Sequence, residues 1–208
     1  MAPSSCRIGV IGAGTVGAGV IEVLRTRADL IERRSGVRLE LARVAEIDRA
    51  KALAAGVPEA LWVGDFAAIT QAPDIDLVVE LVGGTTVAER IVRSALEAGK
   101  PVVTANKALL AEKGRPLFAL AREKRLALAY EAAVCGGIPI ILAIREGLVA
   151  NRILSLLGIV NGTCNYILTQ MIEKGVAYAA ALQEAQALGY AEADPRFDVE
   201  GIDSGHKL

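Results

Sequence analysis

Residues 7–17 read RIGVIGAGTVG, and this stretch decides the fold class. A short apolar run at residues 7–11 leads directly into three glycines with the spacing G-x-G-x-x-G, and a helical pattern begins after them. In this motif Gly12 allows a tight turn, Gly14 leaves room for a pyrophosphate, and Gly17 lets the helix pack closely on the strand. The N–H groups at a helix N-terminus also favour the negative charge of phosphate. We therefore predict a dinucleotide site with cofactor contacts at Gly12, Ala13, Gly14, Thr15, Val16 and Gly17; the alternative is a plain tight turn.

The rest of residues 1–130 alternates short apolar runs with helical patterns, which is typical of parallel βαβ units. We predict strands at residues 7–11, 38–47, 75–81, 101–104 and 126–130. Helices are predicted at residues 15–33 and 48–55, and from Thr86 and Asn106 onward. Five or six strands with crossover helices predict an α/β fold, a Rossmann-type doubly wound parallel sheet.

Three of these helices carry more detailed signals. The first is expected to bury an apolar stripe, Val16, Val20, Val23, Leu24 and Ile31. In the helix from Thr86, Glu89 completes a capping box, and Gly99 is placed where a C-terminal cap belongs. That helix is expected to bury Val87, Ile91, Ala95 and Leu96. In the stretch from Asn106, Gly114 and Pro116 predict a break and a restart.

The pattern changes after residue 130. A loop rich in Gly and Ala at residues 131–137 precedes a helix with Pro139 in its first turn, and residues 152–160 are predicted to form a strand. Two more helices are predicted, at residues 162–174 with Gly175 as cap and at residues 177–188 with Gly189 as cap.

We therefore predict two domains, with a boundary near residue 130. Residues 1–130 would form the dinucleotide-binding domain, and residues 131–208 the beginning of a second domain. A helix that starts near Ile202 has little room before Leu208, so we expect the chain to be part of a longer protein.

The composition excludes several classes of protein. The 208 residues carry 23 Lys and Arg against 24 Asp and Glu, and a net charge near −1 predicts no nucleic-acid partner and no anionic membrane. The uncharged stretch at residues 153–172 is interrupted by polar residues and glycines, so we expect no transmembrane helix. Residues 1–7 lack the pattern of a signal peptide. Three cysteines at unrelated spacings predict no disulfide framework and favour a reducing cytoplasm. The classes of protein that remain are a soluble enzyme and a ligand-binding protein.

Charged residues are found at the end of the second predicted strand and directly after it. Glu46 or Asp48 could bind a ribose 2′-hydroxyl and favour NAD, whereas Arg49 or Lys51 could meet a 2′-phosphate and favour NADP. All four could equally be solvated charges of a turn. We count Glu46 among the cofactor contacts and leave the choice between NAD and NADP open.

Residues 104–107 read TANK at the carboxyl end of a predicted strand, where ligands of such sheets bind. A cation at a helix N-terminus is mildly unfavourable, so Lys107 indicates a functional role; the alternative is an exposed surface lysine. In the loop after residue 130, Cys135 is interpreted as a small apolar filler because no base is paired with it in the sequence.

The segment at residues 189–207 is densely charged. Its carboxylates are Glu192, Asp194, Asp198, Glu200 and Asp203. If a helix starts at Ile202, Asp203 and Lys207 lie four residues apart on one face. The alternative is a solvated charged face. His206 is the only histidine, and its neighbours suggest neither a metal site nor a triad.

Residues 185–207 resemble the signature of the homoserine dehydrogenases. The match runs from Ala185 through Gly189-Tyr190-Ala191, Asp194-Pro195, Asp198-Val199, Gly201 and Asp203 to Lys207. Residues 104–107, 130–141 and 161–168 also resemble motifs of this family, in the same order. The resemblance implies reduction of L-aspartate 4-semialdehyde to L-homoserine with NADPH or NADH, on the route to threonine, methionine and isoleucine. A non-catalytic dinucleotide-binding fragment or sensor module is the alternative.

The resemblance also implies roles for individual residues. Lys207 would be the proton donor, and Lys107 a second essential lysine that contacts cofactor and substrate. Glu192 and Asp203 would hold the amino group of the substrate. The remaining pocket residues would be Thr163, Tyr190 and Asp198, and the remaining cofactor contacts Thr104 and Gly189.

The resemblance further implies a monovalent cation, such as sodium, bound mostly through backbone oxygens. The matching positions are Glu131, Val134, Gly136 and Ile138. Oxygen ligands of this kind suit a hard cation. The resemblance also implies that residues 131–208 are the beginning of an α+β substrate-binding and dimerisation domain, and that the full-length protein is a homodimer.

Overall fold

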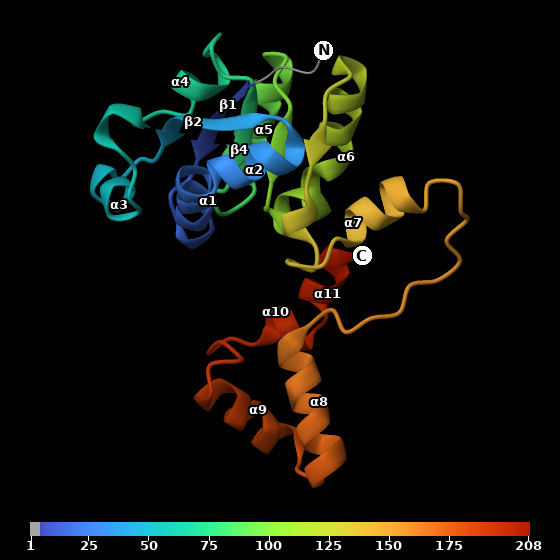
Figure 1. Ribbon diagram of the computed structural model, residues 1–208. Coiled ribbons are helices and arrows are strands. Elements are labelled where there is room, and N and C mark those ends of the chain that lie inside the picture. The colour runs from blue at the N-terminus through green and yellow to red at the C-terminus, as the bar shows by residue number, and fades with distance from the viewer. Residues whose placement is uncertain (1–4) are drawn as a thin grey trace. The chain divides into compact units, whose positions relative to one another are not determined.

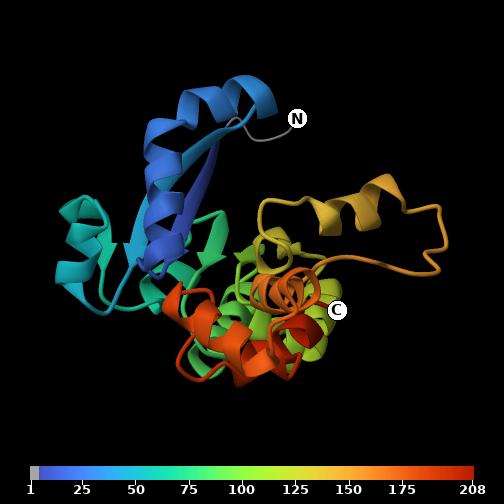
Figure 2. The same ribbon diagram turned by 90° about the horizontal axis from the view of Figure 1, so that it is seen from below.

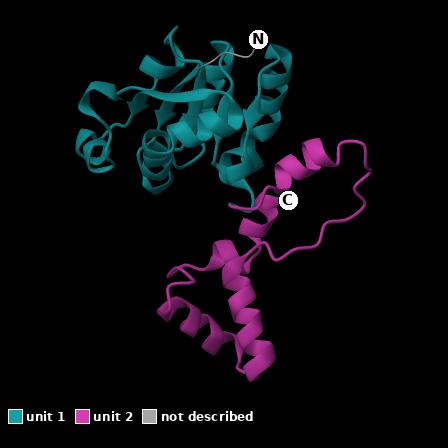
Figure 3. Cartoon of the chain, in the orientation of Figure 1, with its two compact units in different colours: residues 1–136 teal, residues 137–208 magenta. Residues whose placement is uncertain are grey.

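A computed structural model describes residues 5–208 of the chain (Figure 1). Residues 1–4, which belong to the stretch where we expect no signal peptide, lie outside the described residues. The chain divides into two compact units, residues 1–136 and residues 137–208 (Figure 3). Among residues 5–208, no helix is both long enough and apolar enough to cross a membrane.

Unit 1 contains a six-stranded parallel sheet with the order β3-β2-β1-β4-β5-β6. The strands are β1 (Ser5–Ile11), β2 (Arg38–Ala45), β3 (Trp62–Val63), β4 (Leu77–Glu80), β5 (Val102–Thr104) and β6 (Leu128–Ala129). This order confirms the predicted doubly wound Rossmann-type sheet. The sequence analysis did not predict the short strand β3.

Helices cover both faces of the sheet. In unit 1 they are α1 (Thr15–Thr26), α2 (Ala28–Ser35), α3 (Arg49–Ala54), α4 (Ala67–Thr70), α5 (Thr86–Glu97) and α6 (Lys107–Lys124), with a 3₁₀ turn at Glu59–Leu61. One apolar cluster contains buried residues of α4, α5 and α6, and a second contains those of α1 and α3. Val78 and Val79 of β4 fall in different clusters because neighbouring strand residues point to opposite faces.

The predicted helix at residues 15–33 is two helices, and the chain turns between them at Arg27 (Figure 2). Its predicted apolar stripe is wrong in part: Leu24 is buried and Val20 packs against the core as predicted, but Val16 and Val23 are about half exposed. Helix α1 buries Gly17 and Ile21 beside Leu24 instead. The spacing of four and three residues places the buried side chains on one helical face.

The predicted capping box of α5 is wrong. Thr86 is the first helical residue, and the N-cap is Thr85, whose side chain makes no capping hydrogen bond. Glu89 instead forms ion pairs with Arg93 at 3.1 Å and with Lys113 of α6 at 2.9 Å. Gly99 has the left-handed φ of 79° expected of its predicted cap position. The buried face is Ala88, Ile91, Val92, Ala95 and Leu96, while Val87 is exposed.

Helix α6 runs without interruption through Gly114 and Pro116, so the predicted break is wrong. Proline lacks the N–H of an interior helix bond. Burial of Leu109, Leu117 and Ala121 against the core holds the helix together across this position.

Unit 2 is helical in the part of the chain described. Its elements are α7 (Ile140–Leu142), the π-helical turn η3 (Ala143–Gly147), α8 (Gly162–Lys174), α9 (Tyr178–Ala187), α10 (Arg196–Val199) and α11 (Ile202–Lys207). Gly175 and Gly189 have positive φ after α8 and α9, as predicted. A small core packs α8 against α9 and consists of Ile167, Ala181, Ala185 and Ala191.

The predicted strand at residues 152–160 is absent from the described structure, where residues 152–161 form neither helix nor strand (orange loop, Figures 1 and 2). A strand needs a neighbour for its backbone hydrogen bonds, and no described strand pairs with this segment. Its apolar side chains are exposed, Leu157 almost completely at 99%.

Candidate active site

The glycine motif connects β1 to α1 at the carboxyl edge of the sheet. Gly12 has a φ of 100°, and a Cβ atom there would lie 2.7 Å from the carbonyl oxygen of Leu81. A Cβ atom at Gly17 would overlap the carbonyl oxygen of Gly12, so helix and turn touch closely. Gly14 has no heavy atom within 4 Å of its Cβ position, and α1 begins beside it without a side-chain cap. The motif therefore leaves open space next to the N-terminus of a helix, which suits a phosphate.

Glu46 follows β2 and reaches back to this motif. Its Oε2 accepts a hydrogen bond from the N–H of Ala13 at 2.9 Å and lies 3.5 Å from the Lys51 ammonium. Burial opposes the charge on this carboxylate, but the N–H groups of Ala13 and Asp48 together with Lys51 outweigh it and lower the pKa of Glu46. Glu46 is thus an ionised group beside the glycine motif.

The other three charged residues of this turn already have partners. Asp48 caps α3 by accepting from the N–H groups of Ala50 and Lys51. Arg49 forms an ion pair with Glu59 and lies over the ring of Trp62, 5.7 Å from its centroid. The cations that could meet a 2′-phosphate are therefore both paired with carboxylates.

The ends of β4 and β5 meet at a buried polar network. Glu80, which the sequence analysis did not single out, has no exposed surface, and its Oε2 accepts from the Thr104 hydroxyl at 2.5 Å. Thr104 is also fully buried and accepts from the N–H of Asn106 at 3.0 Å. Asn106 caps α6 through the N–H of Leu109, and Lys107 is the first residue of that helix. An acid that ends the short apolar run of residues 77–79 is the sequence signal that could have identified Glu80.

The predicted cation ligands lie in an irregular segment. Glu131 belongs to the 3₁₀ turn Glu131–Ala133, and its carbonyl oxygen accepts from the N–H of Val134 at 3.4 Å. Cys135 and Gly137 have positive φ, so the backbone around Gly136 changes direction sharply. Ile138 belongs to unit 2 and is 61% exposed. Within residues 5–208, no group of three or more His, Cys, Asp or Glu side chains could hold a metal ion.

In unit 2, Lys207 lies in a cluster of buried polar groups. Its Nζ donates to Asp203 Oδ2 at 2.7 Å, one helical turn away as predicted, and to the carbonyl oxygen of Val160. Asn161 Nδ2 donates to Asp198 Oδ1 at 2.8 Å and to Asp203 Oδ2 at 2.9 Å. Asn161 and Asp203 are 8% and 7% exposed, so a lysine is held here by a carboxylate that is largely withdrawn from water.

Asn161 was not among the predicted site residues. Its Oδ1 caps α8 by accepting from the N–H of Cys164 at 2.7 Å, so one side chain both starts the helix and joins the two aspartates. An Asn immediately before a helical pattern is a signal that could have identified it. Burial, followed by the charges of Asp198 and Asp203, raises the pKa of the Cys164 thiol.

The other predicted residues of unit 2 lie around the ends of α8 and α9. The Thr163 hydroxyl donates to the carbonyl oxygen of Tyr190 at 2.6 Å, and the Tyr190 ring stacks at 4.8 Å on Tyr166. Gly189 begins the loop after α9. Glu192 follows in that loop and is exposed. The structure therefore joins Asp198, Asp203 and Lys207 in one cluster, and Thr163 and Tyr190 in one contact.

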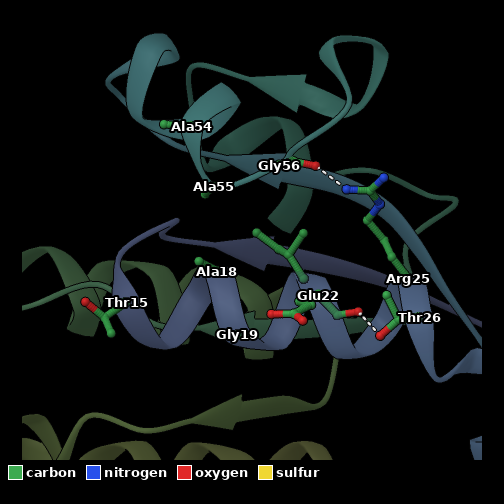
Figure 4. A pocket seen from close by; sticks show the side chains of 10 residues that line it. Thr15, Ala18, Gly19, Glu22, Arg25, Thr26, Ala54, Ala55 and Gly56 are labelled. Atoms are coloured by element: carbon green, nitrogen blue, oxygen red, sulfur yellow. Dashed lines mark hydrogen bonds between the residues drawn. The ribbon is translucent and has the colours of Figure 1, made fainter.

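A pocket of about 660 Å³ lies along α1 and the end of α3 (Figure 4). Its lining residues are Thr15, Ala18, Gly19, Ile21, Glu22, Arg25, Thr26, Ala54, Ala55 and Gly56. Arg25 reaches across it and donates to the carbonyl oxygen of Gly56 at 2.5 Å. Thr15 is the one lining residue that belongs to the glycine motif, so we do not assign this pocket to the cofactor.

Comparison with known proteins gives a consistent result for both units. A family model described as the NAD binding domain of homoserine dehydrogenase matches residues 12–131, and one described as homoserine dehydrogenase matches residues 139–208. The homoserine dehydrogenase of Pseudomonas aeruginosa is 54% identical over 203 residues, which are 97% of this chain and 46% of that protein. The chain spans about half the length of the curated relatives it matches.

Solved structures are similar over nearly the whole chain. The crystal structure of a homoserine dehydrogenase from Thiobacillus denitrificans has a TM-score of 0.88 and 49% identity, and the match covers 98% of this chain and 47% of that one. A hyperthermophilic archaeal homoserine dehydrogenase in complex with NADPH has a TM-score of 0.77 and 27% identity, and the match covers 98% of this chain and 67% of that one.

Proposed function

The chain belongs to the homoserine dehydrogenase family, and from this premise we propose that it carries the cofactor-binding and proton-donating parts of an enzyme that interconverts L-aspartate 4-semialdehyde and L-homoserine. The observation in the structure that carries the proposal is the Lys207 cluster, in which an ammonium group is held by the buried carboxylate of Asp203. An enzyme that reduces an aldehyde needs such a positioned donor for the developing alkoxide.

The residues of unit 1 fit a nicotinamide dinucleotide. The open space beside Gly14 and the uncapped start of α1 would receive the pyrophosphate, and Glu46 would face the adenosine ribose. Lys107 and the backbone of Thr104 would contact the cofactor at the end of β5, because the Thr104 side chain is buried. When bound, the dinucleotide supplies or accepts the hydride.

The residues of unit 2 would bind and protonate the substrate. Lys207 would give a proton to the substrate oxygen in the direction of reduction and take it back in the direction of oxidation. Asp203 keeps the Lys207 ammonium in place, with Asn161 bonded to the same carboxylate oxygen. Asp203 and Glu192 would hold the substrate's amino group, while Thr163, Tyr190 and Asp198 would line the pocket near Gly189. Carboxylates around an ammonium favour an amino acid over a plain aldehyde.

The test is homoserine-dependent reduction of NAD and of NADP, measured for the chain, for Lys207→Ala and for Lys107→Ala. We expect either substitution to abolish turnover, while Lys207→Ala leaves dinucleotide binding intact. Lys174→Ala is the matched control, because Lys174 is an exposed lysine in the last turn of α8. Turnover that survives Lys207→Ala would contradict the proposed proton donor. Dinucleotide binding without turnover would favour a non-catalytic binding fragment, which the match to only half of each relative also allows.

The choice of cofactor depends on Glu46. Its ionised carboxylate would hydrogen-bond a ribose hydroxyl and repel a 2′-phosphate. We expect Glu46→Gln to shift the ratio of NADP affinity to NAD affinity upward by about tenfold, a typical effect of one charged hydrogen bond. Glu97→Gln, at the end of α5, is the control. An unchanged ratio would remove Glu46 from the cofactor contacts.

Three further properties of the whole protein are part of the proposal. A monovalent cation would bind through backbone oxygens of Glu131, Val134, Gly136 and Ile138, and replacing sodium by a large organic cation should then lower activity. The exposed apolar segment at residues 153–159 supports a homodimer, which sedimentation of Leu157→Asp would test. Three free cysteines support a reducing compartment such as the cytoplasm.

A further inference from the structure

We propose that Glu80 is the positioning residue of the cofactor site, a buried carboxylate that holds the ends of β4 and β5 and the start of α6 in the arrangement that binds the dinucleotide. This inference rests on the proposed function, since it concerns the cofactor of that same site.

Glu80 joins three segments through both of its carboxylate oxygens. Oε1 accepts from the N–H of Val82 at 2.8 Å, which folds the chain back directly after β4. Oε2 accepts from the hydroxyl of Thr104 at 2.5 Å, which ties β4 to the end of β5. The Thr104 hydroxyl in turn accepts from the N–H of Asn106 at 3.0 Å. A single side chain therefore fixes the turn after β4 and the turn after β5.

Asn106 extends this network to the loop at residues 81–84 and to α6. Its Nδ2 donates to the carbonyl oxygens of Val82 at 3.1 Å and of Gly84 at 2.7 Å. Its Oδ1 accepts from the N–H of Leu109 and so caps the helix that begins with Lys107. The position of Lys107 thus depends on the same network as the loop after β4.

The loop after β4 also borders the glycine motif. The N–H of Leu81 donates to the carbonyl oxygen of Ile11 at 2.8 Å, and the carbonyl oxygen of Leu81 lies against Gly12. In the order β3-β2-β1-β4-β5-β6, the strands β1 and β4 flank the topological switch point, where the order of the strands along the chain reverses. Ligands of such sheets bind at this point. Glu80 therefore ends the strand between β1, which leads into the glycine motif, and β5, which leads into the turn before Lys107.

A carboxylate is a costly choice for a purely structural role here. Glu80 is fully buried, and among the described residues no cation forms an ion pair with it. A buried carboxylate without a cation costs free energy unless hydrogen bonds compensate it. Burial raises the pKa of Glu80 despite the bonds from Thr104, Val82 and Asn106. A destabilising buried carboxylate at the ligand-binding edge of a sheet is typical of a functional position.

The test removes the Glu80–Thr104 bond from each side. Glu80→Gln keeps the size of the side chain but offers an N–H₂ group where one oxygen accepts, and Thr104→Val keeps the shape of Thr104 but removes its hydroxyl. The matched control is Thr70→Val, because Thr70 is equally buried and its hydroxyl accepts from Ser94 between α4 and α5. The dissociation constants of NADH and NADPH are measured by titration, together with the unfolding temperature and amide hydrogen exchange at Val82 and Leu109.

We expect Glu80→Gln and Thr104→Val each to weaken dinucleotide binding by about tenfold and to speed exchange at Val82 and Leu109, while Thr70→Val changes neither. The dissociation constant of the double variant should be no higher than that of the single variant that binds more weakly, because both substitutions remove the same hydrogen bond. If all three variants lose thermal stability and the dissociation constants stay equal to that of the unmodified chain, Glu80 is structural and the inference is wrong. If the unmodified chain binds no dinucleotide, the proposed function fails and the inference fails with it.

Discussion

The three glycines of the nucleotide motif differ in what surrounds them, and this difference can be measured. Gly14→Ala should fold like the unmodified chain, because its Cβ position is open and its φ of −69° suits alanine. The new methyl group would, however, occupy the space next to the predicted pyrophosphate, and we expect at least a tenfold loss of dinucleotide affinity, about 1.4 kcal/mol.

Gly19→Ala is the control within the same helix. Its Cβ position is also open, and alanine stabilises a helix interior by about 0.5–1 kcal/mol relative to glycine. Thermal unfolding and NADH titration of both variants check the prediction. A Gly14→Ala chain that binds as tightly as Gly19→Ala would show that the phosphates do not approach Gly14.

The raised pKa of Glu80 leads to a prediction about how the stability of the chain depends on pH. Its folded pKa is raised above the ordinary value of 4.5, so the unfolded chain loses this proton at lower pH than the folded chain does. The stability that Glu80 contributes is therefore complete below pH 4.5 and is lost as the pH rises through the folded pKa. We expect the free energy of unfolding of the unmodified chain, relative to that of Glu80→Gln, to decrease as the pH rises.

Urea unfolding of both chains at a series of pH values measures this difference, and other titrating groups cancel in it. Glu97→Gln, a substitution at the exposed end of α5, is the control. A difference that grows with pH would mean that Glu80 is held as an anion.

Among the elements, α6 is the clearest case in which packing overrides a local signal. Pro116 lies in the middle of this helix, and its buried neighbours Leu109, Leu117 and Ala121 keep the helix continuous. Pro116→Ala restores the missing N–H bond, so we expect it to stabilise the chain by up to about 3 kcal/mol, the difference between proline and alanine in a helix interior. Calorimetry tests this, with Arg115→Ala as the neighbouring control. A lower unfolding temperature would show that the chain uses the proline to shape α6.

The elements also show how far the sequence could be interpreted. The strands β1, β2, β4 and β5, and the helices α8 and α9, follow from periodicity and from terminal glycines. The strand predicted at residues 152–160 could not be tested by periodicity, because a strand exists only with a hydrogen-bonding neighbour. The break between α1 and α2 and the continuity of α6 depend on tertiary packing, which a local pattern does not contain.

The same distinction between local pattern and tertiary packing explains which site residues could be predicted. Asp203 and Lys207 could be paired because four residues along a helix is a fixed distance. Glu80 and Asn161 were not predicted, because their hydrogen-bond partners Thr104 and Asp203 lie 24 and 42 residues away in the sequence. Whether Glu46 and Lys107 bind a cofactor remains a prediction.

At the scale of the whole molecule, the apolar cores are distributed very unequally between the two units. Both large clusters lie in residues 1–136. Taken together, they include buried residues from five of the six strands of the sheet. Unit 2 has a core of four buried residues, three of them alanines, and exposes the apolar segment at residues 153–159. Since a domain needs its own core to fold alone, unit 1 meets this condition and unit 2 does so poorly.

We therefore expect residues 1–136 to fold as an independent domain and to bind NADH or NADPH with a dissociation constant within about twofold of that of the whole chain. The reason is that all the predicted cofactor contacts except Gly189 belong to this unit, together with Glu80 and the sheet that positions them. Circular dichroism with thermal unfolding tests the folding, and fluorescence titration tests the binding, with Gly14→Ala in the same fragment as the control. A folded fragment that binds tenfold more weakly would mean that residues 137–208 contribute directly to the cofactor site, and an unfolded fragment would mean that the small core of unit 2 is required for the sheet to form.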